Sequence, residues 1–178
     1  MTEYFLLKTD AMVLFEPVDF DSKLYQHVMT REHFEKLPKD KICYYKYADE
    51  VELPDVMRRP TFMVGTSIYN IVKLYDETVE WKALQVFPDQ LDFVREMAKS
   101  YWIPCLPEYA CLHGDAVVLP NGTVERLILN RGRMRNMDIF RVADERIREN
   151  LVVVSLPLAE SINRRNVYGV SMERVEVR

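Results

Sequence analysis

The same strand–helix–strand pattern occurs twice in the chain, and this repeat restricts the accessible folds more than any other feature. In the first copy the apolar run "TFMVG" is followed by a helix-spaced segment and by "VEWKALQVF", which alternates like a strand. In the second copy "NLVVVS", a helical segment and "VSMERVEV" follow in the same order. Ser67 to Phe87 spans the same length as Ser155 to Val175, which indicates two copies of one unit. Because such units are common, coincidence remains the alternative.

Local signals predict where the elements begin and end. Ser67 and Ser155 are the predicted N-caps of the two helices, and Pro157 suits a first helical turn, where its missing N–H costs little. Asn121-Gly122 predicts a hairpin turn, and "EYFLLK" near the N-terminus predicts a strand. A weak helical spacing runs through residues 22–37, residues 48–60 are expected to form a loop, and the last strand is expected to contain a bulge.

These elements predict a single α+β domain covering residues 1–178. We expect a mixed, mostly antiparallel sheet flanked by two or three helices. The hydrophobic fraction of 48% is that of an ordinary packed protein. No segment has the roughly 20 consecutive apolar residues of a membrane span, and the N-terminus does not resemble a signal peptide. We therefore expect a cytoplasmic protein that does not contact a membrane.

The charge distribution argues against a nucleic-acid-binding protein. Residues 1–90 contain 11 Lys+Arg against 16 Asp+Glu, within a net charge of -4 for the whole chain. A phosphate-binding face needs a basic excess gathered on one surface. The acidic first half favours a basic protein partner instead.

The stretch "CLPEYACLHGD" is the candidate for a chemical site. In an extended chain Cys111, His113 and Asp115 would share one face, as in a thiol–imidazole–carboxylate relay. Neighbours on a strand face stand roughly 6–7 Å apart, however, which is too far for nucleophile-to-base contact. The spacing from Cys105 matches no usual zinc pattern, although Cys43 could supply a further ligand. We expect buried, reduced thiols with no metal, no cofactor and no catalysis; an enzyme or metal-binding domain using these residues is the alternative.

A cluster of tyrosines and acids is the predicted contact surface. "KICYYKYADE" and the acids after it combine aromatic anchors with charges that would steer a basic partner. A half-buried edge strand followed by a solvated loop is the alternative. The predicted contact residues are Tyr44, Tyr45, Tyr47, Asp49, Glu50, Glu52 and Asp55.

The order of motifs from residue 60 onward resembles a known family. The motifs are "YWIPCLPEYACL" (101–112), "ERLILN" (125–130), "MDIFRV" (137–142), "VVVSLPLAESI" (152–162) and "YGVSMERVEV" (168–177). Together they resemble the family numbered eleven among the bacterial immunity proteins of polymorphic toxin systems, formerly a domain of unknown function. The resemblance covers residues 60–178, whereas residues 1–55 diverge from it.

The resemblance implies a non-catalytic protein that binds a cognate toxin and blocks it. No catalytic residue carries over from the family, and a protein that acts by occlusion needs none. The toxin would suit the acidic first half if it were basic. A scaffold or oligomer component is a further alternative, and self-association is left open.

Overall fold

The computed structural model of the chain has the predicted α+β fold. It describes residues 3–10, 17–18, 20–21, 23–46, 52–89, 98–134 and 136–178. Within these residues the helices are α1 (Arg31–Lys36), α2 (Thr66–Tyr75) and α3 (Leu156–Asn163), with a short 3-10 helix η2 (Arg131–Arg133). The strands are β1 (Tyr4–Thr9), β2 (Pro17–Val18), β3 (Asp40–Tyr45), β4 (Val56–Met57), β5 (Met63–Gly65), β6 (Glu80–Pro88), β7 (Lys99–Cys105), β8 (Glu108–Tyr109), β9 (Val117–Val118), β10 (Val124–Arg126), β11 (Ile128–Leu129), β12 (Ile139–Val142), β13 (Val152–Ser155) and β14 (Val170–Val177).

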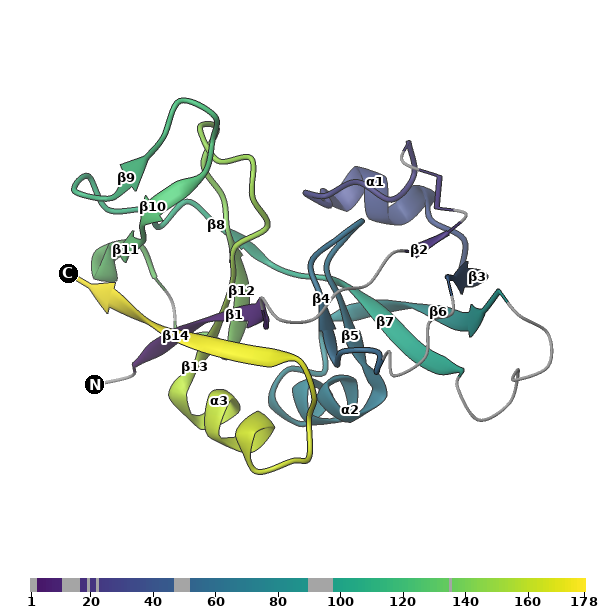
Figure 1. Cartoon of the computed structure of the whole chain (residues 1–178). Helices are drawn as coiled ribbons and strands as arrows, with labels where there is room; N and C mark the ends of the chain where they lie inside the picture. The colour runs from purple at the N-terminus through teal and green to yellow at the C-terminus, as the bar shows by residue number, and fades with distance from the viewer. Residues whose placement is uncertain are drawn as a thin grey trace.

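The described strands form two six-stranded sheets and one two-stranded hairpin (Figure 1). The first sheet has the order β2-β3-β6-β7-β5-β4, and all its pairs are antiparallel except β3 with β6. The second has the order β11-β14-β1-β13-β12-β8, with parallel pairs only at β11–β14 and β12–β8 among the described strands. The predicted mixed, mostly antiparallel character is confirmed.

The predicted repeat is confirmed as a repeat of topology. The strands β3-β6-β7-β5-β4 of the first sheet and β11-β14-β1-β13-β12 of the second have the same order and the same directions. In each unit the two strands joined by a helix flank a third strand that is antiparallel to both. That third strand is β7 in the first unit, whereas β1 from the N-terminus fills the place in the second.

The strand register makes the two units equivalent residue by residue. Tyr101 on β7 pairs with Gly65 at the end of β5, and Tyr4 on β1 pairs with Ser155 at the end of β13. Both tyrosines are buried. Gly65 and Ser155 are also the N-caps of α2 and α3, so the units coincide from strand through cap to helix.

The N-cap residues of the two helices differ because the aspartate beside each cap, Asp55 in the first unit and Asp138 in the second, makes different contacts. Gly65 N donates to Asp55 O at 2.8 Å, and Ser155 N donates to Asp138 O at 2.9 Å. In the second unit the Ser155 hydroxyl donates to the Asp138 carboxylate and accepts from Leu158 N. In the first unit the Asp55 carboxylate occupies the space that a side chain at Gly65 would need. The first unit therefore requires glycine where the second has a serine cap.

Packing of α2 against α3 joins the two units around one core. Ile68 and Val72 on α2 and Leu158 and Ile162 on α3 are buried in a single apolar cluster that includes residues of both sheets. The Tyr75 hydroxyl on α2 lies 3.0 Å from Pro157 O on α3, to which it donates. Figure 1 shows the two helices side by side below the sheets. The two units therefore share one apolar core.

The prediction that Ser67 caps α2 is wrong, whereas the Ser155 cap is confirmed. The N-cap of α2 is Gly65 and the helix begins at Thr66, two residues earlier than the sequence signal indicates. The predicted hairpin is also confirmed, since Val124 pairs with Val118 and Gly122 has a φ of 84°.

Three other local predictions are corrected. Within the predicted helical region the described helix is α1 alone, which begins after the Thr30 cap and ends at an extended Leu37 that precedes Pro38. The region expected to be a loop contributes β4 to the first sheet. The last strand has no bulge, because its register against β1 is continuous from Val170 to Val175. No helix within the described ranges is both long enough and apolar enough to cross a membrane.

Candidate partner-binding surface

The structure leaves two of the predicted contact residues exposed. Tyr44 lies on β3 with 43% of its surface exposed, and Glu52 is exposed shortly before β4. Tyr47, Asp49 and Glu50 lie outside the described residues. Of the predicted contact residues that the structure describes, Tyr44 and Glu52 are the exposed ones.

Tyr45 and Asp55 are corrections to the predicted contact surface, because both are buried in this protein's own interior. Tyr45 is 1% exposed, since alternation along β3 turns it to the face opposite Tyr44. Asp55 is 8% exposed; its carboxylate accepts from Tyr168 N at 2.8 Å and lies 2.9 Å from Lys99 Nζ. Neither side chain is available to a partner.

Tyr44 belongs to an uncovered sheet face that the sequence prediction did not identify. Ile42, two residues earlier on β3, is 56% exposed. It pairs with Gln85, and Tyr44 pairs with Phe87, so these four side chains lie on one face of β3 and β6. We call the face formed by Ile42, Tyr44, Ala83, Gln85, Phe87 and Ser100 the open face. Period-two alternation in "KICYY" is the signal that could have paired Ile42 with Tyr44.

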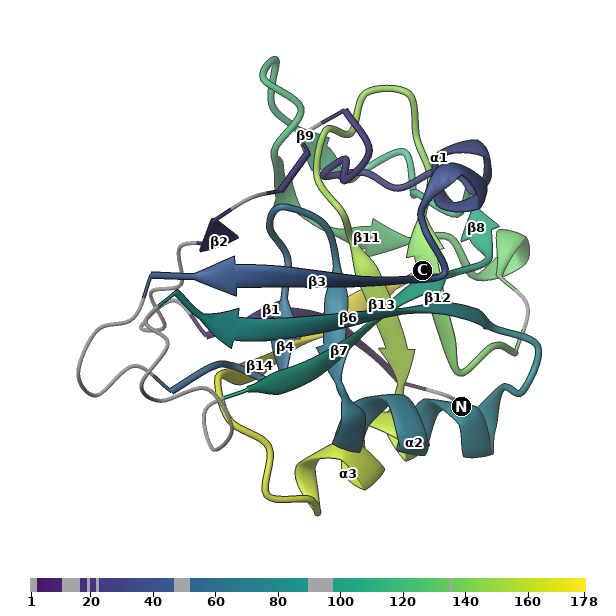
Figure 2. The same cartoon turned by 90° about the vertical axis from the view of Figure 1, so that its right-hand side faces the viewer.

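The helix α2 covers the neighbouring part of this sheet and stops short of the open face. Tyr69 on α2 stacks on Trp102 of β7 with ring centroids 4.0 Å apart, and it meets Trp81 of β6 edge-on at 5.0 Å. In Figure 2 α2 lies below β7, and none of the labelled helices lies in front of β3 and β6. The sheet is thus covered by an aromatic cluster at one end and is exposed at the other.

The thiol of Cys111 is insulated from solvent. Cys111 is completely buried within an apolar cluster, and burial raises the pKa of its thiol to about 11. The Nδ1 atom of His113 accepts a hydrogen bond from Asp115 N at 3.1 Å, and the Asp115 carboxylate forms an ion pair with Arg178. At neutral pH the thiol is protonated and is therefore a poor nucleophile. Within the described part of the chain no three His, Cys, Asp or Glu side chains are grouped to hold a metal ion.

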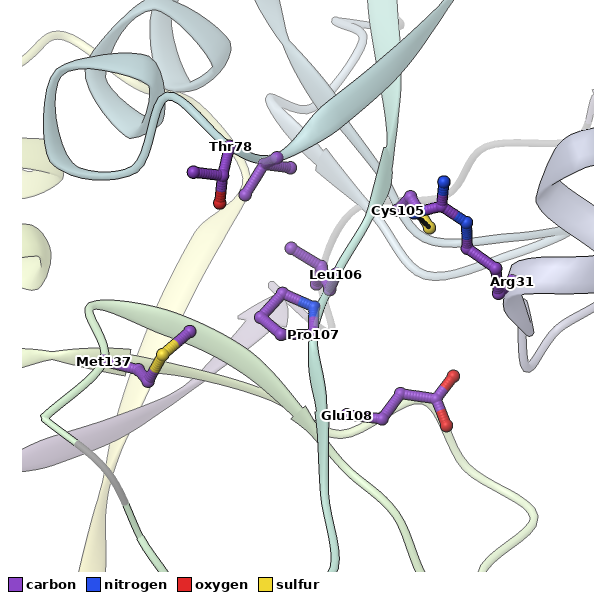
Figure 3. Close-up of a pocket in the computed structure, with 8 residues that line it drawn as sticks. Arg31, Thr78, Cys105, Leu106, Pro107, Glu108 and Met137 are labelled. Atoms are coloured by element: carbon purple, nitrogen blue, oxygen red, sulfur yellow. Dashed lines mark hydrogen bonds between the residues drawn. The ribbon is translucent and has the colours of Figure 1, made fainter.

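A cleft of about 380 Å³ lies beside Cys105, which is partly exposed, unlike Cys43 and Cys111. Residues of α1, of the turn between α2 and β6, of the β7–β8 connection and of the segment before β12 line it; Figure 3 shows Arg31 extending beside Cys105. Arg31 Nη1 lies 3.8 Å from Cys105 Sγ, and Arg31 Nη2 forms an ion pair with Glu80 at 2.6 Å. Partial burial raises the pKa of the Cys105 thiol, and Arg31 opposes that shift. The cleft holds a paired cation and a protonated thiol rather than an activated nucleophile.

His27 and His33 are half-buried and serve the local structure. His27 Nδ1 lies 3.0 Å from the Arg58 carbonyl, and burial lowers the pKa of its imidazole, aided by the Arg58 and Arg59 guanidinium groups. His33 Nδ1 lies 2.8 Å from the Thr30 hydroxyl at the start of α1. Neither histidine lies with the Cys111 cluster.

No family model matches this chain, and no curated protein matches it. The resemblance to immunity proteins therefore depends on the motifs quoted above.

Proposed function

We propose that this protein is a non-catalytic, immunity-type binding protein that acts in the cytoplasm by covering a cognate bacterial toxin. The observation that carries the proposal is the pair of exposed apolar side chains Ile42 and Tyr44, side by side on a sheet face that none of the described helices covers. Exposed tyrosines and isoleucines gathered on one face are typical of protein contact sites.

The places of the resembling motifs in the fold support this proposal. Tyr101, Cys111, Phe140 and Ser155 come from three of those motifs, and all four residues are buried. The motifs thus contribute to the scaffold, and the open face lies on β3 and β6, largely outside them. A scaffold shared across a family with a variable contact face suits proteins that each bind a different partner.

The chemistry of the thiols favours a binder over the enzyme alternative. An enzyme using Cys111, His113 and Asp115 would need a thiolate within reach of the imidazole. Burial holds the pKa of Cys111 near 11, and the His113 Nδ1 atom accepts from a backbone N–H. A protein that blocks its partner by contact needs neither group.

Charge supports a basic partner. Residues 1–90 carry the excess of acids, 16 Asp+Glu against 11 Lys+Arg, and five of the six open-face residues belong to that half of the chain. Opposite net charges accelerate the encounter of two proteins, and salt weakens this attraction. A basic toxin would therefore associate rapidly at low ionic strength.

Expression of the tagged protein in its own host, followed by mass spectrometry of the purified material, tests the proposal. We expect one partner at near-equal amount, and co-expression should relieve the toxicity of that partner. The variant Cys111→Ser should protect equally well, because the proposed activity does not use the thiol. Recovery of the protein alone, or loss of protection in Cys111→Ser while the fold is retained, would refute the proposal. A partner-free oligomer would favour the scaffold alternative.

A further inference from the structure

The internal repeat provides a comparison for the open face, because strands β11 and β14 of the second unit are equivalent to β3 and β6 of the first. Ile42 on β3 pairs with Gln85 on β6, and Ile128 on β11 pairs with Glu176 on β14. The two isoleucines are therefore equivalent. The chain covers Ile128 completely, at 0% exposure, but leaves Ile42 at 56%.

The surface around the equivalent position in the second unit is a network of charges. Arg126 lies 2.8 Å from Glu176, Arg178 lies 2.6 Å from Glu176, and Arg174 pairs with Glu3. All five side chains are substantially exposed. This is the usual composition of a sheet face that stays in water.

The same positions in the first unit carry almost no charge. Glu176 corresponds to Gln85, and Arg174, two residues earlier, corresponds to Ala83. Ser100 and Glu3 correspond because each directly precedes the tyrosine that pairs with an N-cap residue. The Ser100 hydroxyl donates to Gln85 Oε1 at 2.9 Å, so these two polar groups satisfy each other.

One carboxylate remains on this face. Asp40 precedes Ile42 by two residues on β3, is exposed, and pairs in register with Ala83. Its counterpart Arg126, two residues before Ile128, forms an ion pair across the strands. Asp40 has no such neighbour, because Gln85 is neutral, and it has no ion-pair partner among the described residues.

We infer that the open face is the docking site for the partner of the proposed function, and that the partner presents an apolar patch with a lysine or arginine beside it. This inference rests on the proposed function and specifies the surface and the partner's chemistry. The apolar patch would cover Ile42, Tyr44 and Phe87, as the chain itself covers Ile128. The partner's cation would lie against Asp40, where the second unit has an internal ion pair. Tyr44 is the expected anchor, because tyrosines contribute disproportionately to binding when they are desolvated at the centre of an interface.

The test uses the partner protein that the tagged wild-type chain recovers, which is then purified and titrated against variants. Ile42→Thr and Tyr44→Thr keep a good strand residue at each position and remove the apolar surface. Combined, they should weaken binding by about 30-fold or more, the effect of losing one strong hot spot. Asp40→Lys should slow association about tenfold at low salt, and Asp40→Asn should flatten the salt dependence of the association rate.

The matched control is Leu74→Thr on α2. Leu74 is an exposed apolar side chain at 80% that lies outside the open face, so its replacement should leave binding unchanged. Circular dichroism and thermal unfolding of each variant check that the fold is intact, which is expected because the replaced side chains are exposed. Hydrogen exchange in the complex should show added protection at β3 and β6.

Each outcome separates this inference from the proposed function. Unchanged binding by the Ile42→Thr/Tyr44→Thr protein would overturn the docking site but leave the toxin-blocking proposal standing. A wild-type chain that recovers no partner would overturn both. A wild-type chain that forms dimers, which the same double variant abolishes, would show that a second copy covers the open face and would overturn the assignment to a cationic partner. If Asp40→Lys binds at the wild-type rate and with the wild-type salt dependence, the inference that the partner carries a cation opposite Asp40 is wrong.

Discussion

Replacement of Gly65 by alanine tests the physical account of the repeat directly. A Cβ atom at Gly65 would meet the Asp55 carboxylate well inside van der Waals contact. The carboxylate would have to move, and it would lose its hydrogen bond from Tyr168 N, at 2.8 Å, and its 2.9 Å ion pair with Lys99. The equivalent Ser155 tolerates a side chain because its aspartate accepts a hydrogen bond from that side chain.

The magnitude follows from the two interactions that Asp55 would lose. Loss of a hydrogen bond to a buried group costs about 1–3 kcal/mol. Disrupting a buried ion pair costs about 3–5 kcal/mol, but Lys99 is partly exposed, so solvent reduces this figure. We expect Gly65→Ala to lower the free energy of unfolding by about 2–4 kcal/mol, or the Tm by roughly 5–15 °C for a domain of this size.

Urea unfolding of a double-mutant cycle with Asp55→Ala measures the effect. Once the carboxylate is absent, Gly65→Ala should cost less than about 1 kcal/mol, because only the preference of the N-cap for glycine over alanine remains. Gly114→Ala is the matched control, since no atom lies within 4 Å of the added Cβ; it should change stability by less than about 0.5 kcal/mol. Equal costs of Gly65→Ala with and without Asp55 would refute the reasoning.

Three further predictions concern buried polar groups. Iodoacetamide at neutral pH should leave Cys111 unmodified in the folded protein and modify Cys105 slowly, because Cys111 is inaccessible and its pKa is near 11; intact mass and peptide mapping would detect the reverse order. Tyr101→Phe should lower the free energy of unfolding by about 1–2 kcal/mol, since the buried hydroxyl donates to Pro54 O at 2.6 Å; an unchanged urea midpoint would contradict this. Because the pKa of His27 is lowered in the folded state, the unfolded chain binds the proton first, and stability should fall as the pH drops below about 6.5 towards the folded pKa. In His27→Gln this part of the pH dependence should disappear, and an unaltered pH profile would assign it to other groups.

The predicted contact residues show that the sequence predicts which side chains share a strand face but not which of those faces is buried. Alternation places Tyr44 and Tyr45 on opposite faces of a strand, but it does not say which face the rest of the chain covers. In the sequence nothing distinguishes Asp55 from the exposed acids near it. Its carboxylate is stabilised in the interior by Lys99 and Tyr168, which are distant along the chain.

Local sequence is sufficient to predict the features that depend on neighbouring residues. These include the two strand–helix–strand units, the Ser155 cap and the hairpin at Gly122, because periodicity, caps and positive-φ turns are local properties. The tertiary structure alone decided that β1 completes the second unit and that Ile128 is covered while Ile42 is exposed. Strand pairing and burial depend on contacts between segments far apart in the chain, and no local pattern specifies which distant segment pairs with a strand or covers it.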